Sequence, residues 1–122
     1  MLFQKLWNSG RGEPVDIEYL GLQLRCYLGS NNIENRIILS SKIREQQELR
    51  LLKTCLNNGG TFIDIGANIG YYSLMAAKFG ATQVISFEPN EIVRSRFEFN
   101  SRQNNFSNII DISPLALGEK NG

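Results

Sequence analysis

Residues 61–70 read T-F-I-D-I-G-A-N-I-G, and this stretch constrains the fold more than any other feature of the chain. Its first half is apolar and β-branched, which predicts a short, fully buried strand. Two glycines, Gly66 and Gly70, then lead into a segment with helical spacing. A strand, a tight glycine turn and a helix form the geometry in which backbone approaches a ligand at the carboxyl edge of a parallel sheet.

Length and charge place the chain among ordinary globular proteins. Its 122 residues suffice for one domain at most, and the net charge of +1 comes from interspersed charges of both signs. No apolar run approaches the roughly 20 residues of a membrane span, and residues 1–7 are too short and polar for a signal peptide. We therefore expect a cytoplasmic protein with no nucleic-acid partner and no membrane partner. Nothing in the sequence indicates an oligomeric state.

The absence of histidine limits the chemistry that the chain can support. Imidazole is the commonest general base and the commonest metal ligand. The two cysteines, Cys26 and Cys55, lie in apolar contexts on separate elements and are expected to be buried free thiols. No metal site is expected from these residues.

Residues 1–40 are expected to form an N-terminal extension followed by a β-hairpin. From Val15 apolar residues alternate with polar ones, and Leu20-Gly21 can form the turn.

A helix is then expected, with Ser40 or Ser41 as its N-cap. Its apolar stripe should consist of Ile43, Leu49, Leu52 and Leu56, widened by Leu51 and Cys55. Residues 57–60, N-N-G-G, predict its end.

Residues 41–122 are expected to form an α/β domain. After the strand at residues 61–65, the pattern predicts a helix at 71–79, a strand at 84–87, a helix at 91–104 and a strand at 109–112 that can extend to 117. The inner side of the second of these helices should carry Ile92, Val93, Phe97 and Phe99. This order is that of a right-handed parallel βαβαβ unit, half of a doubly wound sheet. Since a complete domain of this class runs to about 150 residues, the chain is expected to be truncated.

Two acidic residues indicate which ligand the edge of this sheet would accept. Glu88 follows the second parallel strand, where a carboxylate can accept hydrogen bonds from both ribose hydroxyls. Asn68 stands where the dinucleotide fingerprint G-x-G-x-x-G requires its second glycine. Asp64 suits an ammonium group better than a diphosphate. The pattern favours S-adenosylmethionine as the ligand, and therefore a methyltransferase. A nicotinamide-dependent dehydrogenase and a non-catalytic fragment are the alternatives.

Three motifs together resemble the FkbM family of S-adenosylmethionine-dependent methyltransferases. They are D-I-G-A-N-I-G-Y-Y-S from Asp64, I-S-F-E-P-N from Ile85 and S-P-L-A-L-G from Ser113. The match runs from about Glu45 onward and implies a Rossmann-like class I methyltransferase fold. It also implies O-methylation of a hydroxyl on a sugar or another small natural product.

The resemblance implies a set of cofactor-binding residues. Asp64, Gly66 and Asn68 would shape the pocket for the methionine arm, together with Gly70, and Glu88 would hold the ribose. The segment around Leu115 and Ala116 would pass beside the adenine. Asn90 would either contact the ribose or adenine or cap the following helix, and capping is favoured. The family's fourth strand, with its acidic motif, is absent from the sequence, and no residue is identified as the general base.

Overall fold

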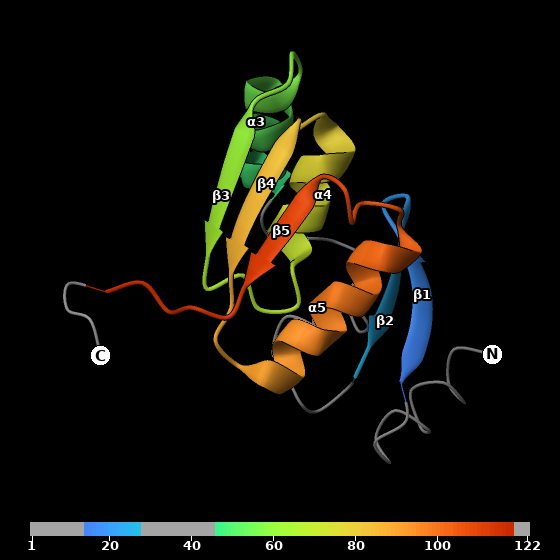
Figure 1. Ribbon diagram of the computed structural model, residues 1–122. Helices are drawn as coiled ribbons and strands as arrows, with labels where there is room; N and C mark the ends of the chain where they lie inside the picture. The colour runs from blue at the N-terminus through green and yellow to red at the C-terminus, as the bar shows by residue number, and fades with distance from the viewer. Residues whose placement is uncertain (1–13, 28–45, 119–122) are drawn as a thin grey trace. The chain divides into compact units, whose positions relative to one another are not determined.

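The computed structural model describes residues 14–27 and 46–118 (Figure 1). The chain divides into two compact units, Met1–Gln46 and Gln47–Gly122. Each unit is considered by itself below. No helix among the described residues is long and apolar enough to cross a membrane.

The first unit contains the expected hairpin. Strands β1 (Val15–Tyr19) and β2 (Leu22–Cys26) pair antiparallel. Leu20 and Gly21 both have positive φ, 51° and 83°, as in the type I′ turn that matches the twist of a two-residue hairpin. Alternate side chains are buried, which confirms the predicted face: Val15, Leu22, Leu24 and Cys26.

Helix α3 (Gln46–Leu56) buries one side, on which Leu49 and Leu56 are 7% and 5% exposed. The expectation that Cys55 is buried is wrong, because Cys55 is exposed. It lies one turn after Leu51, which is 64% exposed, on the side of the helix away from Leu49. The other thiol, Cys26, is buried as expected. The predicted N-cap at Ser40 or Ser41 and the stripe residue Ile43 lie outside the described residues.

The second unit is built on a parallel sheet. Strands β3 (Thr61–Ile65), β4 (Gln83–Phe87) and β5 (Ile110–Ser113) lie in the order β3-β4-β5. Helices α4 (Tyr71–Phe79) and α5 (Glu91–Gln103) connect them and lie on the same side of the sheet (Figure 1). The predicted βαβαβ order is confirmed.

The sheet is covered on one face among the described residues. Toward the helices, Val84 and Ser86 are fully buried and Ile110 is 5% exposed. On the opposite face Ile63 and Ile65 are 58% and 64% exposed. The expectation of a fully buried β3 is therefore wrong. An apolar run does not reveal whether a second layer is present to cover it.

Two expectations about the later elements are corrected. Ile92 is 66% exposed, because the inner side of α5 is centred on Phe97, and polar Asn100 and Ser101 share it. Strand β5 ends at Ser113, so it does not continue to residue 117.

Candidate functional site

The parallel sheet gathers the predicted site residues at one edge. All three strands run in the same direction, so the segments that follow their carboxyl ends lie along the same side. These segments are residues 66–70 after β3, 88–90 after β4 and 114–117 after β5.

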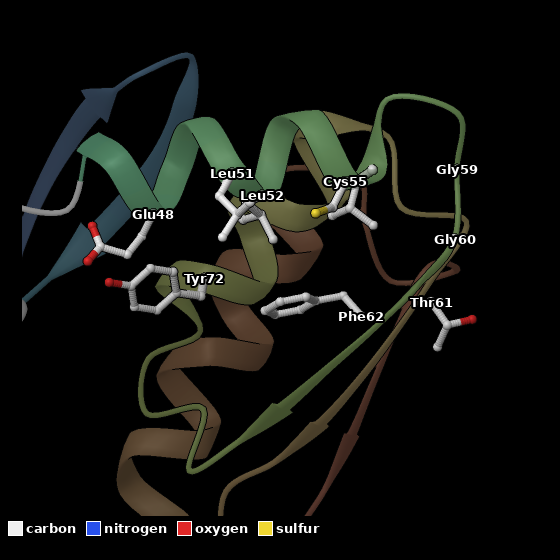
Figure 2. A pocket seen from close by; sticks show the side chains of 10 residues that line it. Glu48, Leu51, Leu52, Cys55, Gly59, Gly60, Thr61, Phe62 and Tyr72 are labelled. Carbon is white, nitrogen blue, oxygen red and sulfur yellow. The ribbon is translucent and has the colours of Figure 1, made fainter.

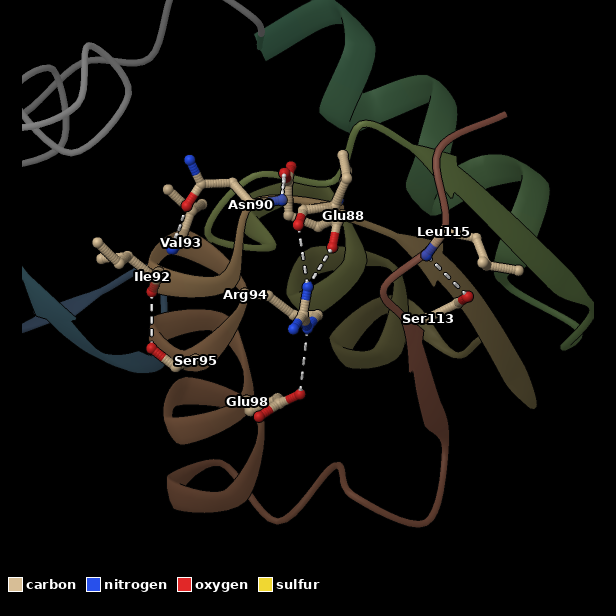
Figure 3. A network of polar contacts seen from close by, with 10 residues as sticks. Glu88, Asn90, Ile92, Val93, Arg94, Ser95, Glu98, Ser113 and Leu115 are labelled. Carbon is tan, nitrogen blue, oxygen red and sulfur yellow. Dashed lines mark hydrogen bonds and ion pairs between the residues drawn. The ribbon is translucent and has the colours of Figure 1, made fainter. Parts of the chain in front are cut away.

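Glu88 fastens two of these segments together. Its side-chain Oε1 accepts a hydrogen bond of 2.7 Å from the backbone N–H of Asn68. Its Oε2 accepts one of 3.0 Å from the backbone N–H of Asn90. Glu88 is 9% exposed, and Figure 3 shows it between α5 and the segment after β5. Because a carboxylate offers about four acceptor sites, these two bonds leave capacity for a ligand's hydroxyl donors.

The turn after β3 is held in a fixed conformation. Gly66, Asn68 and Gly70 all have positive φ, at 69°, 59° and 87°. The N–H of Ala67 donates to the carbonyl of Phe87 at 2.9 Å, which ties the turn to the end of β4. Asparagine tolerates the left-handed region because its short side chain bonds locally, and here Asn68 Oδ1 accepts from the next backbone N–H at 2.9 Å. The turn is ordered by the protein's own contacts.

The two glycines of the turn serve different purposes. A Cβ at Gly70 would overlap the ring of Phe97, whereas a Cβ at Gly66 would meet nothing within 4 Å. Gly70 is therefore required for packing of α5 against the turn. Gly66 leaves open space at the edge of the sheet, where a ligand can approach the backbone.

Asp64 lies below the turn in a chain of hydroxyl groups. Its Oδ2 accepts a bond of 2.6 Å from Ser73 Oγ on α4, and Ser73 Oγ lies 2.8 Å from Ser86 Oγ on β4. Burial raises the pKa of Asp64, the bonds from Ser73 oppose that rise, and the negative charge of Glu88 adds to it. A cation bound near these two carboxylates would relieve both costs.

The raised pKa of Asp64 also sets the sign of its effect on folding. A carboxyl whose folded-state pKa exceeds its unfolded value is stabilising while it is protonated, and this contribution is lost as the pH rises through the folded-state pKa. The ionised carboxylate is therefore kept at a cost to the stability of the ligand-free protein.

The sequence pattern alone assigns no role to Ser73 and Ser86. Both are fully buried. A signal was present, because Ser86 interrupts an apolar strand and lies in register with Asp64 on the neighbouring strand. Two polar residues side by side on the covered face of a sheet indicate a hydrogen-bonded pair or network.

The remaining predicted residues take other positions. Asn90 caps α5, with its side chain accepting a bond of 3.1 Å from the N–H of Val93, so the favoured expectation is confirmed. Leu115 and Ala116 follow β5 at the same edge and are exposed. Arg94 donates to the backbone carbonyls of Glu88 and Pro89, at 3.1 and 3.2 Å, and so supports the segment from below (Figure 3).

A separate groove lies between α3 and the start of β3. It encloses about 480 Å³ and is lined mainly by apolar side chains. Figure 2 shows the rings of Phe62 and Tyr72 below α3, with Glu48 at the end near Tyr72. Among the described residues, no group of acidic, cysteine or histidine side chains could hold a metal ion.

Comparison with known proteins identifies the class of fold. No family model matches the chain. It is 31% identical over 71 residues to the ribosomal protein L11 methyltransferase of Bacillus cereus, which covers 58% of this chain and 23% of that protein. The chain thus spans about a quarter of the length of the curated relatives that it matches.

Solved structures of methyltransferases are also similar to this chain. A SAM-dependent methyltransferase from Agrobacterium tumefaciens superposes with a TM-score of 0.66 at 17% identity, over 86% of this chain and 33% of that one. TYW2 of M. jannaschii, solved in complex with AdoMet, gives 0.64 at 17% identity, over 84% and 43%. The complex of aTrm5 with tRNALeu gives 0.63 at 16% identity, over 84% and 28%. The second unit has the Rossmann-like fold of S-adenosylmethionine-dependent methyltransferases, and the chain is homologous to methyltransferases.

Proposed function

We propose that this chain is the cofactor-binding part of an S-adenosylmethionine-dependent methyltransferase. Residues 41–122 would bind the cofactor, and residues 1–40 would form an accessory extension. The observation that carries the proposal is Glu88, whose buried carboxylate lies at the end of β4 against the turn after β3. A carboxylate at this position of a Rossmann-like sheet receives the hydroxyls of a ribose.

The residues at this edge fit S-adenosylmethionine. Asp64 supplies negative charge for an ammonium group, and the open space beside Gly66 admits the methionine arm. Leu115 and Ala116 would lie beside the adenine. When bound, this cofactor supplies an electrophilic methyl group on a sulfonium. The residues of the chain then bind and orient it, which matters because methyl transfer requires donor and acceptor in line.

Binding of S-adenosylhomocysteine, the demethylated cofactor, tests the proposal directly. We expect thermal shift measurements to show stabilisation of the 122-residue chain by S-adenosylhomocysteine and none by NAD. Protection by NAD alone would support the dehydrogenase alternative and reject the proposal.

Replacing Glu88 tests its role in ribose binding. Glu88→Ala should weaken S-adenosylhomocysteine binding at least about tenfold in calorimetry, because each hydrogen bond to a charged group contributes about 1.5–3 kcal/mol. Glu18→Ala is the matched control, since Glu18 is an exposed glutamate on β1, in the other compact unit. Circular dichroism would establish that both variants fold. Equal affinities in the two variants would contradict the role of Glu88.

For the acceptor we propose a hydroxyl on a sugar or another small natural product. The support is the resemblance of the motifs at Asp64, Ile85 and Ser113 to the FkbM family, together with the balanced charge of the chain. The names of similar proteins include a ribosomal protein L11 methyltransferase and a complex with tRNALeu, so protein and RNA acceptors define the contrary outcomes.

Labelled methyl transfer distinguishes these acceptors. The complete methyltransferase, of which this chain is the proposed cofactor-binding part, would be incubated with methyl-labelled S-adenosylmethionine and a cell extract, which is then separated into small-molecule, protein and RNA fractions. Protein-dependent label in the small-molecule fraction supports the proposal. Label in the protein or RNA fraction rejects the small-molecule acceptor while leaving the cofactor assignment intact.

A further inference from the structure

We propose that Ser73 and Ser86 are positioning residues, which hold the Asp64 side chain ionised and in one orientation beneath the ligand-binding turn. This inference rests on the proposed binding of an adenosyl ligand with an ammonium group. It assigns a role to two residues that lie away from the open edge of the sheet.

The direction of each hydrogen bond follows from the number of protons available. An ionised carboxylate only accepts, so the single hydroxyl proton of Ser73 is donated to Asp64 across 2.6 Å. Ser73 Oγ must then be the acceptor in its 2.8 Å contact with Ser86, and Ser86 the donor. The chain Ser86 to Ser73 to Asp64 therefore has one arrangement when Asp64 is ionised.

Because the two hydroxyls are buried, this series of hydrogen bonds depends on its own three members. Ser73 and Ser86 are both fully buried, so water does not replace a lost bond at either hydroxyl. The three residues come from α4, β4 and β3, and the chain joins these elements directly below the turn. The short contact to Asp64 has the length of a charge-assisted bond, which is stronger than a neutral one.

Protonation of Asp64 would change the arrangement. A protonated carboxyl can itself donate, so the Asp64–Ser73 and Ser73–Ser86 bonds could both reverse. The groups that act on Asp64 from the neighbouring elements are Ser73 on α4 and Glu88 after β4. Ser73 favours the ionised form, whereas burial and the charge of Glu88 favour the protonated form. Ser73 thus offsets part of a cost that the site imposes on Asp64.

Carboxyl-carbon NMR of the whole chain measures this effect without a ligand. The sequence contains three aspartates, Asp16, Asp64 and Asp111, and an Asp64→Asn variant would assign the signal. We expect the titration midpoint of Asp64 to move to higher pH in Ser73→Ala. In Ser86→Ala it should move in the same direction by less, because the direct bond to Asp64 remains. Ser95→Ala, on the exposed side of α5, is the control and should leave it unchanged.

Calorimetry with S-adenosylhomocysteine supplies the functional measurement. The affinity of the wild-type chain for S-adenosylhomocysteine should rise with pH as Asp64 ionises. This rise should occur above pH 3.8, the ordinary pKa of an aspartate, because burial raises the pKa of Asp64. In Ser73→Ala this rise should occur at higher pH, with affinity lost at the acid end and retained at the alkaline end. A change limited to packing would lower affinity equally at every pH.

The possible failures can be told apart. If the Asp64 midpoint is the same in Ser73→Ala and the wild type, the positioning role is rejected, whatever binds. If S-adenosylhomocysteine fails to bind the wild type at any pH, the proposed function is rejected, and the NMR titration still decides the role of Ser73. If Ser73→Ala fails to fold, as shown by circular dichroism, an unchanged midpoint in Ser86→Ala rejects the chain of donors.

Discussion

At the scale of single residues, the two carboxylates of the site differ in their surroundings. Glu88 uses both oxygens to accept backbone N–H bonds from Asn68 and Asn90. Asp64 is bonded to a serine hydroxyl and lies on the covered face of the sheet. Glu88 therefore orders the backbone that surrounds a ligand, whereas Asp64 contributes charge, which is strongest where water is excluded.

The glycines of the turn allow a paired prediction. Gly70→Ala should destabilise the fold by roughly 2–4 kcal/mol, because it combines positive φ with overlap of the Phe97 ring. Gly66→Ala should cost about 1–2 kcal/mol, since φ is positive but the space is open. Urea denaturation of the two variants measures the difference.

Ligand binding separates the glycines further. Gly66→Ala places a methyl group in the space proposed for the methionine arm. Its free energy of S-adenosylhomocysteine binding should therefore weaken by more than its free energy of unfolding falls. Equal destabilisation of the two variants in urea would show that Phe97 moves aside for a Cβ at Gly70.

The sequence predicts which residues form this site better than it predicts what each of them does there. The spacing of Asp64, Gly66, Asn68 and Glu88 brings them to one edge, as expected. The packing role of Gly70 depends on Phe97, which is distant in the chain and cannot be found from local spacing. The roles of Ser73 and Ser86 depend on strand register and on a helix above it, which are tertiary facts.

At the scale of elements, helix α5 begins at a defined cap. Asn90 Oδ1 accepts from the N–H of Val93, and Glu91 in the first turn complements the helix dipole. Asn90→Ala should lower the free energy of unfolding by about 1 kcal/mol in urea denaturation. Asn90→Asp, which keeps an acceptor, should restore most of this loss. If the two variants are equally destabilised, the cap contributes little.

The limits of elements were predicted well where caps and glycines mark them. The sequence pattern predicts a helix at residues 71–79, and α4 spans Tyr71–Phe79, followed by Gly80 in the left-handed region. The buried side of α5 was predicted less well. Apolar residues alone suggested Ile92, whereas the actual inner side includes Asn100 and Ser101, whose polarity conceals their burial.

At the scale of the whole molecule, one face of β3 is uncovered in the part of the chain that is described. Ile63 and Ile65 are exposed there, and β3 pairs with β4 on one side only among the described strands. Adjacent exposed apolar residues beside a free strand edge favour association. The sequence could not predict this exposure, because apolar content specifies a need for burial and not what supplies it.

Sedimentation measures the consequence. We expect the 122-residue chain to self-associate at micromolar concentration. The double variant Ile63→Lys, Ile65→Lys should weaken self-association at least about tenfold, since burying each side chain contributes about 1.5–3 kcal/mol. Ile92→Lys, at an exposed position on α5, is the control and should associate like the wild type. A monomeric wild-type chain would contradict the expectation.

The different burial of the two thiols gives the molecule a built-in label site. Cys55 is exposed on the wall of the groove beside β3, whereas Cys26 is buried in the hairpin. A maleimide dye should therefore attach to Cys55 first in the folded chain and reach Cys26 only after unfolding. The labelling rate at Cys55 would then report whether the groove is filled, and full modification of both thiols would report loss of the fold, in one experiment with the unmodified sequence.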